Sequence, residues 1–251
     1  MATIVGVPMA NWLGQAVGWR WGFAIVTALS LTCATMVWIF APSDRPAATA
    51  SPLRELTALR NRQVWLTLGI GAIGFGGMFS VYTYLGSTLI DVTGVSAAVT
   101  PFVFSAFGVG MTAGNLLVPR FADRRIMTTA GALLAWSSIV LGLYSLAAHN
   151  IWAVTLDVIA IGLGGALATV LQTRLMDVAG EAQGLAAALN HSAFNVANAL
   201  GPWLGGMAVA AGFGWPSTGL VGCALALCGL IVWAISALTP ASLGEVPAEL
   251  S

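Results

Sequence analysis

Eight runs of apolar residues, most of them about twenty residues long, divide this chain almost from end to end. A helix that rises ~1.5 Å per residue needs about twenty such residues to cross a hydrocarbon layer ~30 Å thick. The runs exceed strand length and lack the two-residue alternation of a barrel wall. We therefore predict an all-α membrane protein with about eight transmembrane helices, at residues 2–17, 20–41, 63–86, 98–119, 126–147, 151–172, 184–211 and 215–238.

Composition excludes several other classes of protein. Hydrophobic residues make up 58% of the chain and charged residues 7%, which is more apolar surface than a soluble core of this size can bury. The formal net charge is zero and there is no lysine, so we predict no nucleic-acid partner. Cys33, Cys223 and Cys228 lie inside apolar runs without a His or Cys partner at metal spacing, so we predict no disulfide, metal or cofactor.

The arginines predict the orientation. Eight of the nine fall in residues 43–62, 120–125 and 173–182, and only Arg20 falls on the opposite side. Cytoplasmic loops carry such an excess of basic residues. We therefore predict that both termini are cytoplasmic, that residues 43–62 form a cytoplasmic linker with a short amphipathic helix, and that residues 241–251 form a cytoplasmic tail.

The segment GNLLVPRFADRR, residues 114–125, is unusual in so charge-poor a chain. Arg120, Asp123, Arg124 and Arg125 lie within six positions. Arginines alone would serve to anchor the loop on the cytoplasmic side. Asp123 adds nothing to anchoring, but a carboxylate among arginines at a helix end can form charge-assisted hydrogen bonds that hold two helices together. The residues alone leave both interpretations open.

A glycine-rich helix followed by Arg-x-x-Asp-Arg-Arg resembles the loop motif of the major facilitator superfamily. Other segments resemble helices of its bacterial drug:proton antiporter and arabinose-efflux-permease-like branch. These are VGVPMANWLGQAVGWRWGF (5–23, the fifth helix), VYTYLGSTLIDVTGVS (81–96, the seventh helix and the following loop) and LNHSAFNVANALGPWLGG (189–206, the eleventh helix). The four motifs occur in the family's order and together cover nearly the whole chain.

This resemblance implies a major facilitator fold, in which residues 1–42 are the last two helices of the first half and residues 63–240 are the six-helix second half. It implies a multi-pass protein of the bacterial inner membrane that exports a small organic solute by alternating access, driven by a proton gradient. It implies a gating role for Gly114, Arg120, Asp123 and Arg124, and places in helix motifs for Gly6, Pro8, Gly14, Gly201, Pro202 and Gly205. Pro119 stands where relatives usually have glycine.

An internal repeat supports this organisation. NWLGQ at 11–15 matches PWLGG at 202–206, and Trp19 matches Trp215. The interval holds six helices with their connections, which predicts two parallel six-helix halves. Only the last two helices of the second half have partners in this chain. We therefore expect the chain to lack four helices at its N-terminus, which would come from the same gene or from another polypeptide.

One face of the predicted helix 184–211 is polar. At 100° per residue, four residues fall within about 60° of one another: His191, Asn195, Asn198 and Pro202. Such a face should contact protein or water rather than lipid. Hydrogen bonding between helices and lining of a cavity both stay open. Tyr82 and Tyr84 lie toward the outer end of their helix, where a membrane-interface belt and contact with a substrate are the two alternatives.

Asp157 is the only acidic residue clearly inside a predicted span, ~9 Å from the outer end. A charged aspartate at such a depth costs ~2.5–3.5 kcal/mol unless it is hydrated or paired. Asp157 is therefore a candidate for proton coupling, with a structural, hydrogen-bonded carboxylate as the alternative. Gly110 with Gly114, and Gly201 with Gly205, have the spacing that lets helix backbones approach closely.

We predict a secondary transporter whose partners are membrane lipid and a small-molecule substrate, and not an enzyme. An intramembrane hydrolase needs a nucleophile with a positioned base. His149 and His191 are the only histidines, and neither G-x-S-x-G nor H-E-x-x-H occurs. The alternative to the transporter is a transport-inactive remnant or an auxiliary membrane subunit of the same fold.

Overall fold

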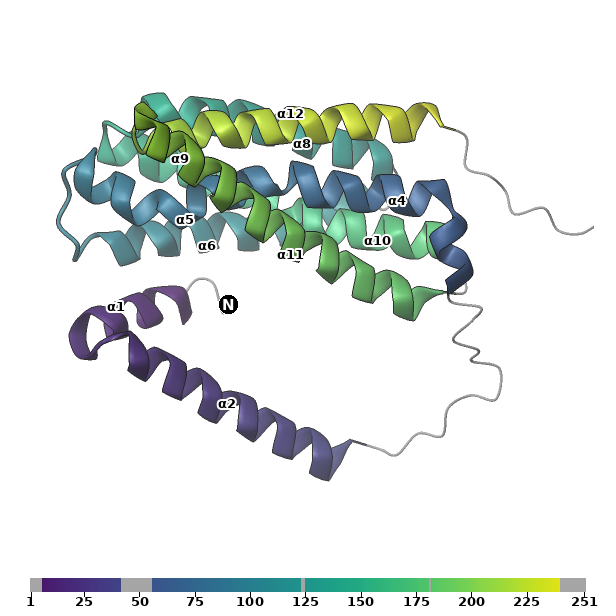
Figure 1. Cartoon of the computed structure of the whole chain (residues 1–251), viewed down its shortest axis with the longest axis horizontal. Helices are drawn as coiled ribbons and strands as arrows, with labels where there is room; N and C mark the ends of the chain where they lie inside the picture. The colour runs from purple at the N-terminus through teal and green to yellow at the C-terminus, as the bar shows by residue number, and fades with distance from the viewer. Residues whose placement is uncertain (1–5, 42–55, 123–124, 181, 240–251) are drawn as a thin grey trace, which may run out of the picture.

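The computed structural model describes residues 6–41, 56–122, 125–180 and 182–239 (Figure 1). These residues contain helices and no strand, which confirms the all-α prediction. Seven helical segments are long and apolar enough to span a membrane: Trp19–Phe40, Arg62–Asp91, Thr100–Phe121, Ile126–Ala147, Ile151–Ala179, Gln183–Phe213 and Ser217–Leu238. The predicted span at 2–17 falls only partly within the described residues, where it forms the 11-residue helix α1 (Val7–Val17).

Six of the seven spans form one bundle. In chain order they are α4 (Arg62–Gly69), η3 (Ile70–Gly74) and α5 (Gly76–Asp91); α6 (Thr100–Leu117) with α7 (Pro119–Ala122); α8 (Ile126–Ala147); α9 (Ile151–Leu163), η4 (Gly164–Ala166) and α10 (Leu167–Ala179); α11 (Gln183–Ala208) with η5 (Val209–Phe213); and α12 (Ser217–Leu238). The closest pairs are α8 with α12, α6 with α9, and α5 with both α11 and α12. Two spans of the bundle are interrupted midway. The π-helical turn η3 interrupts Arg62–Asp91, and the 3-10 turn η4 interrupts Ile151–Ala179.

Glycines set the closest approaches between these helices. A Cβ atom on Gly110 or Gly114 of α6 would collide with the backbone of Ile159 or Leu163 of α9. On α11, a Cβ atom at Gly201 would collide with the backbone of Gly76 of α5. The small-residue spacing in the sequence therefore corresponds to helix packing at both places.

The two N-terminal helices lie beside the bundle. Helix α1 packs against α6, whereas α2 (Trp19–Phe40) has no buried residue. Figure 1 shows α1 and α2 on the side of the bundle that α6 and α11 occupy. A largely apolar helix that exposes its whole circumference is compatible with lipid or protein around it, and not with water.

The internal repeat has a structural counterpart. Gly18 precedes α2 with φ 96° and ψ 153°, and Gly214 precedes α12 with φ 77° and ψ 169°. A positive φ of this kind favours glycine, and each glycine is followed by a tryptophan, Trp19 or Trp215. Helices α2 and α12 are both 22 residues long. The matched sequence positions thus form the same turn before helices of equal length.

Hydrogen bonds join loops at each end of the bundle. The Thr93 hydroxyl donates to the carbonyl of Ala148 at 2.7 Å, which ties the 92–99 connection to the 148–150 connection. At the other end, the Asn61 amide donates to the carbonyl of Val178 at 2.9 Å. The 92–99 and 148–150 connections therefore share one end of the bundle, and residue 61 lies at the opposite end with the last turn of α10.

The bounds of several spans differ from the sequence-based ones by a few residues, and the largest of these differences is at the end of α10. The span predicted at 151–172 continues to Ala179, because no helix-breaking residue occurs before Gly180, whose φ is 58°. Arg174 therefore lies in α10, half-buried, and not in a loop. Of the predicted linker, residues 56–60 form the 3-10 turn η2 (Leu56–Arg60), while residues 43–55 and the tail at 241–251 lie outside the described residues.

Candidate functional site

Helix α11 has a packed face and an exposed polar face. The packed face consists of small residues, including Ala193, Ala197 and Gly201, which lie against η3 and α5. The polar face lies about 120° around the helix and carries exposed side chains of His191, Asn195 and Asn198. We call these three residues the α11 polar stripe.

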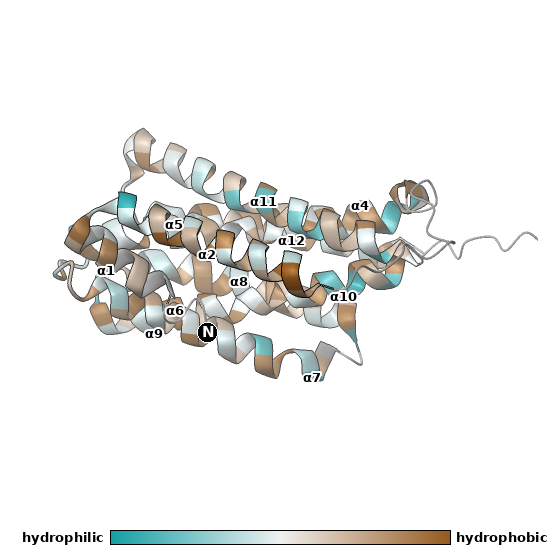
Figure 2. Ribbon diagram, turned by 90° about the horizontal axis from the view of Figure 1, so that it is seen from below, coloured by the Kyte–Doolittle hydropathy of each residue, from teal (hydrophilic) through white to brown (hydrophobic). Residues whose placement is uncertain are grey.

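Contact of the α11 polar stripe with lipid would cost free energy. Imidazole and amide groups in hydrocarbon lose hydrogen bonds to water, and each unsatisfied group costs on the order of a kcal/mol or more. Figure 2 shows hydrophilic positions along α11. All three residues of the stripe are exposed, so no other helix among the described residues buries the stripe. Water, a solute or another protein segment must therefore contact the stripe.

In addition to the stripe, one exposed polar pair joins α6 to α10. The Thr169 hydroxyl donates to the side-chain carbonyl oxygen of Asn115 at 2.8 Å, and the Asn115 amide donates to the carbonyl of Met111 at 2.9 Å. Both Asn115 and Thr169 are exposed. Sequence reasoning missed this pair, since each is a single short polar residue in an apolar run and only the packing of α6 beside α10 brings them together.

The two tyrosines of α5 have different roles in packing. The Tyr84 hydroxyl donates to the carbonyl of Pro202 in α11 at 2.9 Å, so it links two helices next to the proline. Tyr82 is half-buried, and its ring lies 5.3 Å from that of Phe104 and 4.7 Å from that of Phe107. Tyr84 thus serves helix packing, whereas the Tyr82 hydroxyl makes no hydrogen bond within the described residues, so Tyr82 stays the better candidate for solute contact.

Asp157 lies in α9, apart from the α11 polar stripe. Its neighbours on the helix, Val154 and Val158, are buried in the bundle core. One carboxylate oxygen, Oδ2, is buried without a hydrogen-bond partner among the described residues, and so is the hydroxyl of Tyr144 in α8. The two side chains are close enough to interact electrostatically. Asp157 thus belongs to a buried polar pair between α8 and α9.

Two further buried hydroxyl groups are those of Thr88, which lies beside this pair, and Thr100. Thr88 of α5 lies beside the Tyr144 hydroxyl, but its own hydroxyl donates to the carbonyl of Tyr84 at 3.0 Å. Thr100, at the start of α6, has a buried hydroxyl oxygen with no partner in the described part of the chain. Unpaired buried polar groups are uncommon, and they cluster where a proton or a conformational change has a role.

The predicted gating motif is described only in part. Gly114 packs against the backbone of Leu163, and Arg120 is exposed at the end of α7. Asp123 and Arg124 lie outside the described residues, so the proposed charge cluster stays a prediction. Pro119 begins α7, which is a favourable place for proline because the first turn of a helix lacks N–H partners.

The helix-motif residues near the N-terminus define the start of α1. Gly6 immediately precedes the helix and Pro8 lies in its first turn. Gly14 has open space around it, unlike the closely packed Gly201 and Gly205 of α11. Gly14 therefore sets no close helix approach within the described residues, although α1 as a whole packs against α6.

Comparison with known proteins decides the family. The family model described as Major Facilitator Superfamily matches residues 1–146, which is more than half of the chain. The chain belongs to the major facilitator superfamily. This confirms the resemblance inferred from its four motifs and, with seven apolar helices, makes it a multi-pass membrane protein.

Several members of the superfamily are similar to it along most of its length. The "Inner membrane transport protein YdhP" of Escherichia coli (strain K12) is 33% identical over 238 residues, covering 94% of this chain and 61% of that protein. The "Chloramphenicol resistance protein" of Streptomyces lividans is 32% identical over 211 residues, covering 80% and 53%. The "Probable sugar efflux transporter" of Pasteurella multocida (strain Pm70) is 27% identical over 239 residues, covering 93% and 58%. The chain thus spans between 53% and 61% of the length of these major facilitators.

Proposed function

We propose that this major facilitator is a secondary active transporter of the bacterial inner membrane that exports a small organic solute in exchange for protons. The observation that carries the proposal is the α11 polar stripe, an exposed row of hydrogen-bonding groups within an apolar span. In alternating access, a solute site lies near the bilayer midplane between two helix bundles that rock about it. The stripe supplies donors and acceptors for such a site.

The chemistry of the stripe favours an uncharged solute. Asn195 and Asn198 offer amide donors and acceptors, His191 offers an imidazole, and the stripe contains no carboxylate or guanidinium. Tyr82, whose half-buried ring packs on the buried Phe104 and Phe107, adds an aromatic side chain. The names of two relatives, a chloramphenicol resistance protein and a sugar efflux transporter, agree with solutes of this class.

Asp157 and Tyr144 are the groups that we propose couple solute movement to protons. A deprotonated Asp157 can only accept a hydrogen bond, whereas a protonated Asp157 can also donate one, and the Tyr144 hydroxyl, which has no partner among the described residues, can take either role. Helix α9 ends at the 3-10 turn η4, where Gly164 and Gly165 interrupt the span. A short 3-10 segment within a helix is a common place for a hinge. Protonation can thereby change how α9 packs against α8 and bend the span.

Flux measurements test the transport proposal. Purified protein in vesicles with an acidic interior should accumulate radiolabelled chloramphenicol or glucose, because protons that leave drive the solute inward. Accumulation that does not exceed that of protein-free vesicles for either probe would favour the alternative, an auxiliary or transport-inactive membrane subunit. The observation that favours this alternative is the complete exposure of α2.

The same assay tests Asp157. Asp157→Asn should reduce gradient-driven accumulation by at least about ten-fold, while exchange of labelled for unlabelled probe at equal pH continues. Asp91→Asn is the matched control, since Asp91 is exposed at the end of α5 and should leave both activities unchanged. Equal losses of both activities in Asp157→Asn would assign the carboxylate a structural role.

We also propose that both termini face the cytoplasm, because the arginine excess lies at the end of the bundle that carries Arg60 and Arg62. In intact cells, an impermeant thiol reagent should label a cysteine at the exposed position Ala97, and should reach one at Arg60 only after permeabilisation. The reverse pattern would invert the orientation.

A further inference from the structure

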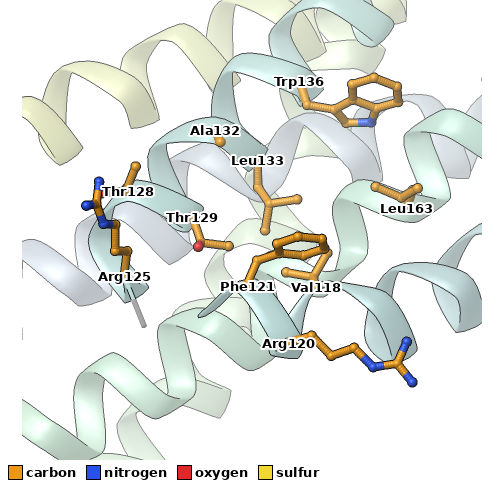
Figure 3. A pocket seen from close by; sticks show the side chains of 10 residues that line it. All are labelled: Val118, Arg120, Phe121, Arg125, Thr128, Thr129, Ala132, Leu133, Trp136 and Leu163. Atoms are coloured by element: carbon orange, nitrogen blue, oxygen red, sulfur yellow. The ribbon is translucent and has the colours of Figure 1, made fainter. Parts of the chain in front are cut away.

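A groove opens on the arginine-rich end of the bundle, away from the α11 polar stripe. It lies between α7 and the first half of α8, with the end of α9 as its inner wall, and has a volume of about 720 Å³. Figure 3 shows Val118, Phe121 and Leu133 in its middle, with Arg120 and Arg125 on opposite sides. We call it the α7–α8 groove.

The walls of the groove are apolar. Val118 and Leu133 form a buried floor, and Phe121 is 70% exposed beside them. Trp136 closes the deep end, and its only polar group, the indole N–H, donates to the carbonyl of Ala160 at 2.8 Å. The indole ring therefore presents carbon to the groove. Such walls suit hydrocarbon and offer little to a small hydrated anion.

The mouth of the groove is basic. Arg120 and Arg125 both line the groove and both are exposed. The hydroxyl-bearing Thr128 and Thr129 also line the groove next to Arg125. A guanidinium group is well suited to bind phosphate oxygens through two parallel hydrogen bonds.

The depth of the groove matches the dimensions of a membrane leaflet. Arg125 and Trp136 are eleven residues apart on α8, which corresponds to ~16 Å along the helix axis. Half of a bilayer's hydrocarbon core is ~15 Å thick. A ligand with its charge at the basic mouth and its apolar part against Trp136 would thus extend from the membrane interface toward the midplane. Basic pockets between transmembrane helices bind anionic lipid head groups in this manner.

We propose that the α7–α8 groove binds an anionic phospholipid from the leaflet on the arginine-rich side. The phosphate lies at the basic mouth, where Arg120 and Arg125 flank the groove on opposite sides, and an acyl chain lies along Phe121, Ala132 and Trp136. This places a lipid beside Arg120 of α7, so lipid composition would influence a residue of the predicted gating motif. The proposal does not depend on the solute that the protein carries.

Native mass spectrometry of the delipidated protein, titrated with dioleoylphosphatidylglycerol, tests this site. Arg120→Gln with Arg125→Gln should weaken binding of the first lipid by about ten- to thirty-fold. Each arginine near an anionic membrane surface contributes about three- to five-fold to the affinity, and the two factors multiply. The matched control is Arg60→Gln with Arg62→Gln, which removes two exposed arginines from the same end of the bundle outside the groove and should leave this binding unchanged.

A second variant tests the groove without changing charge. Ala132 is exposed, so Ala132→Trp should fill the groove, leave the melting temperature in micelles close to that of the wild type, and also weaken lipid binding. Equal weakening in the Arg60 and Arg62 control, or equally tight binding of dioleoylphosphatidylcholine, would overturn the proposal. Displacement of the lipid by millimolar inorganic phosphate would instead indicate a site for a soluble anion and would also overturn it.

Discussion

Gly110→Ala should lower the melting temperature of the protein in detergent micelles by about 5–10 °C, or prevent its accumulation in the membrane. The new methyl group would point into the carbonyl and Cα of Ile159, which are backbone atoms of α9 and cannot rotate away. Overpacking of this kind typically costs ~1–3 kcal/mol, and each kcal/mol shifts the midpoint of a protein of this size by about 2–4 °C. The effect is large because α6 and α9 form one of the closest helix pairs of the bundle.

Gly86→Ala is the matched control for this prediction. A Cβ atom on Gly86 would meet only the methyl group of Thr100, at 3.9 Å, which is ordinary van der Waals contact. Alanine is favoured over glycine in a helix by up to ~1 kcal/mol, so this variant should be as stable as the wild type or more so. Equal melting temperatures for the two variants would show that α6 and α9 are not in the contact described.

Much of the fold was predictable because the membrane imposes length and polarity on each span. The helix at 126–147 was placed with its correct bounds, since a charged loop precedes it and His149 and Asn150 follow it. The end of α10 was placed seven residues too early, because hydropathy falls at Gln172 while the helix continues with Arg174 half-buried. Hydropathy reports which residues contact lipid, and it does not report where the backbone hydrogen bonds stop.

The candidate site was predictable only as far as it depends on one helix. The polar face of α11 follows from the 100° periodicity, and the structure places His191, Asn195 and Asn198 together on an exposed surface. The buried pair of Asp157 with Tyr144 and the exposed pair of Asn115 with Thr169 each join two helices. Contacts between helices depend on rotation and depth within the bundle, which a single sequence does not specify.

The α11 polar stripe should line a water-filled path, and cysteine labelling can measure this directly. In a background with Cys33, Cys223 and Cys228 replaced by alanine, Asn195→Cys should react with a charged, membrane-impermeant thiol reagent at least about ten times faster than Val196→Cys. Only a hydrated thiol ionises to the reactive thiolate, and a charged reagent does not enter hydrocarbon.

The two positions form a close comparison. They differ by one residue, hence by ~1.5 Å in depth, but by 100° around α11, and both are exposed. Val196 lines an apolar groove between α4 and α11, together with Leu68 and Gly69 of α4. This groove does not include the stripe. The labelling rates of Asn195→Cys and Val196→Cys in membrane vesicles are therefore the most direct test of the proposed translocation path. Rapid labelling at Asn195 with slow labelling at Val196 is the result that we expect, and equally slow labelling at both would contradict a water-filled path along α11.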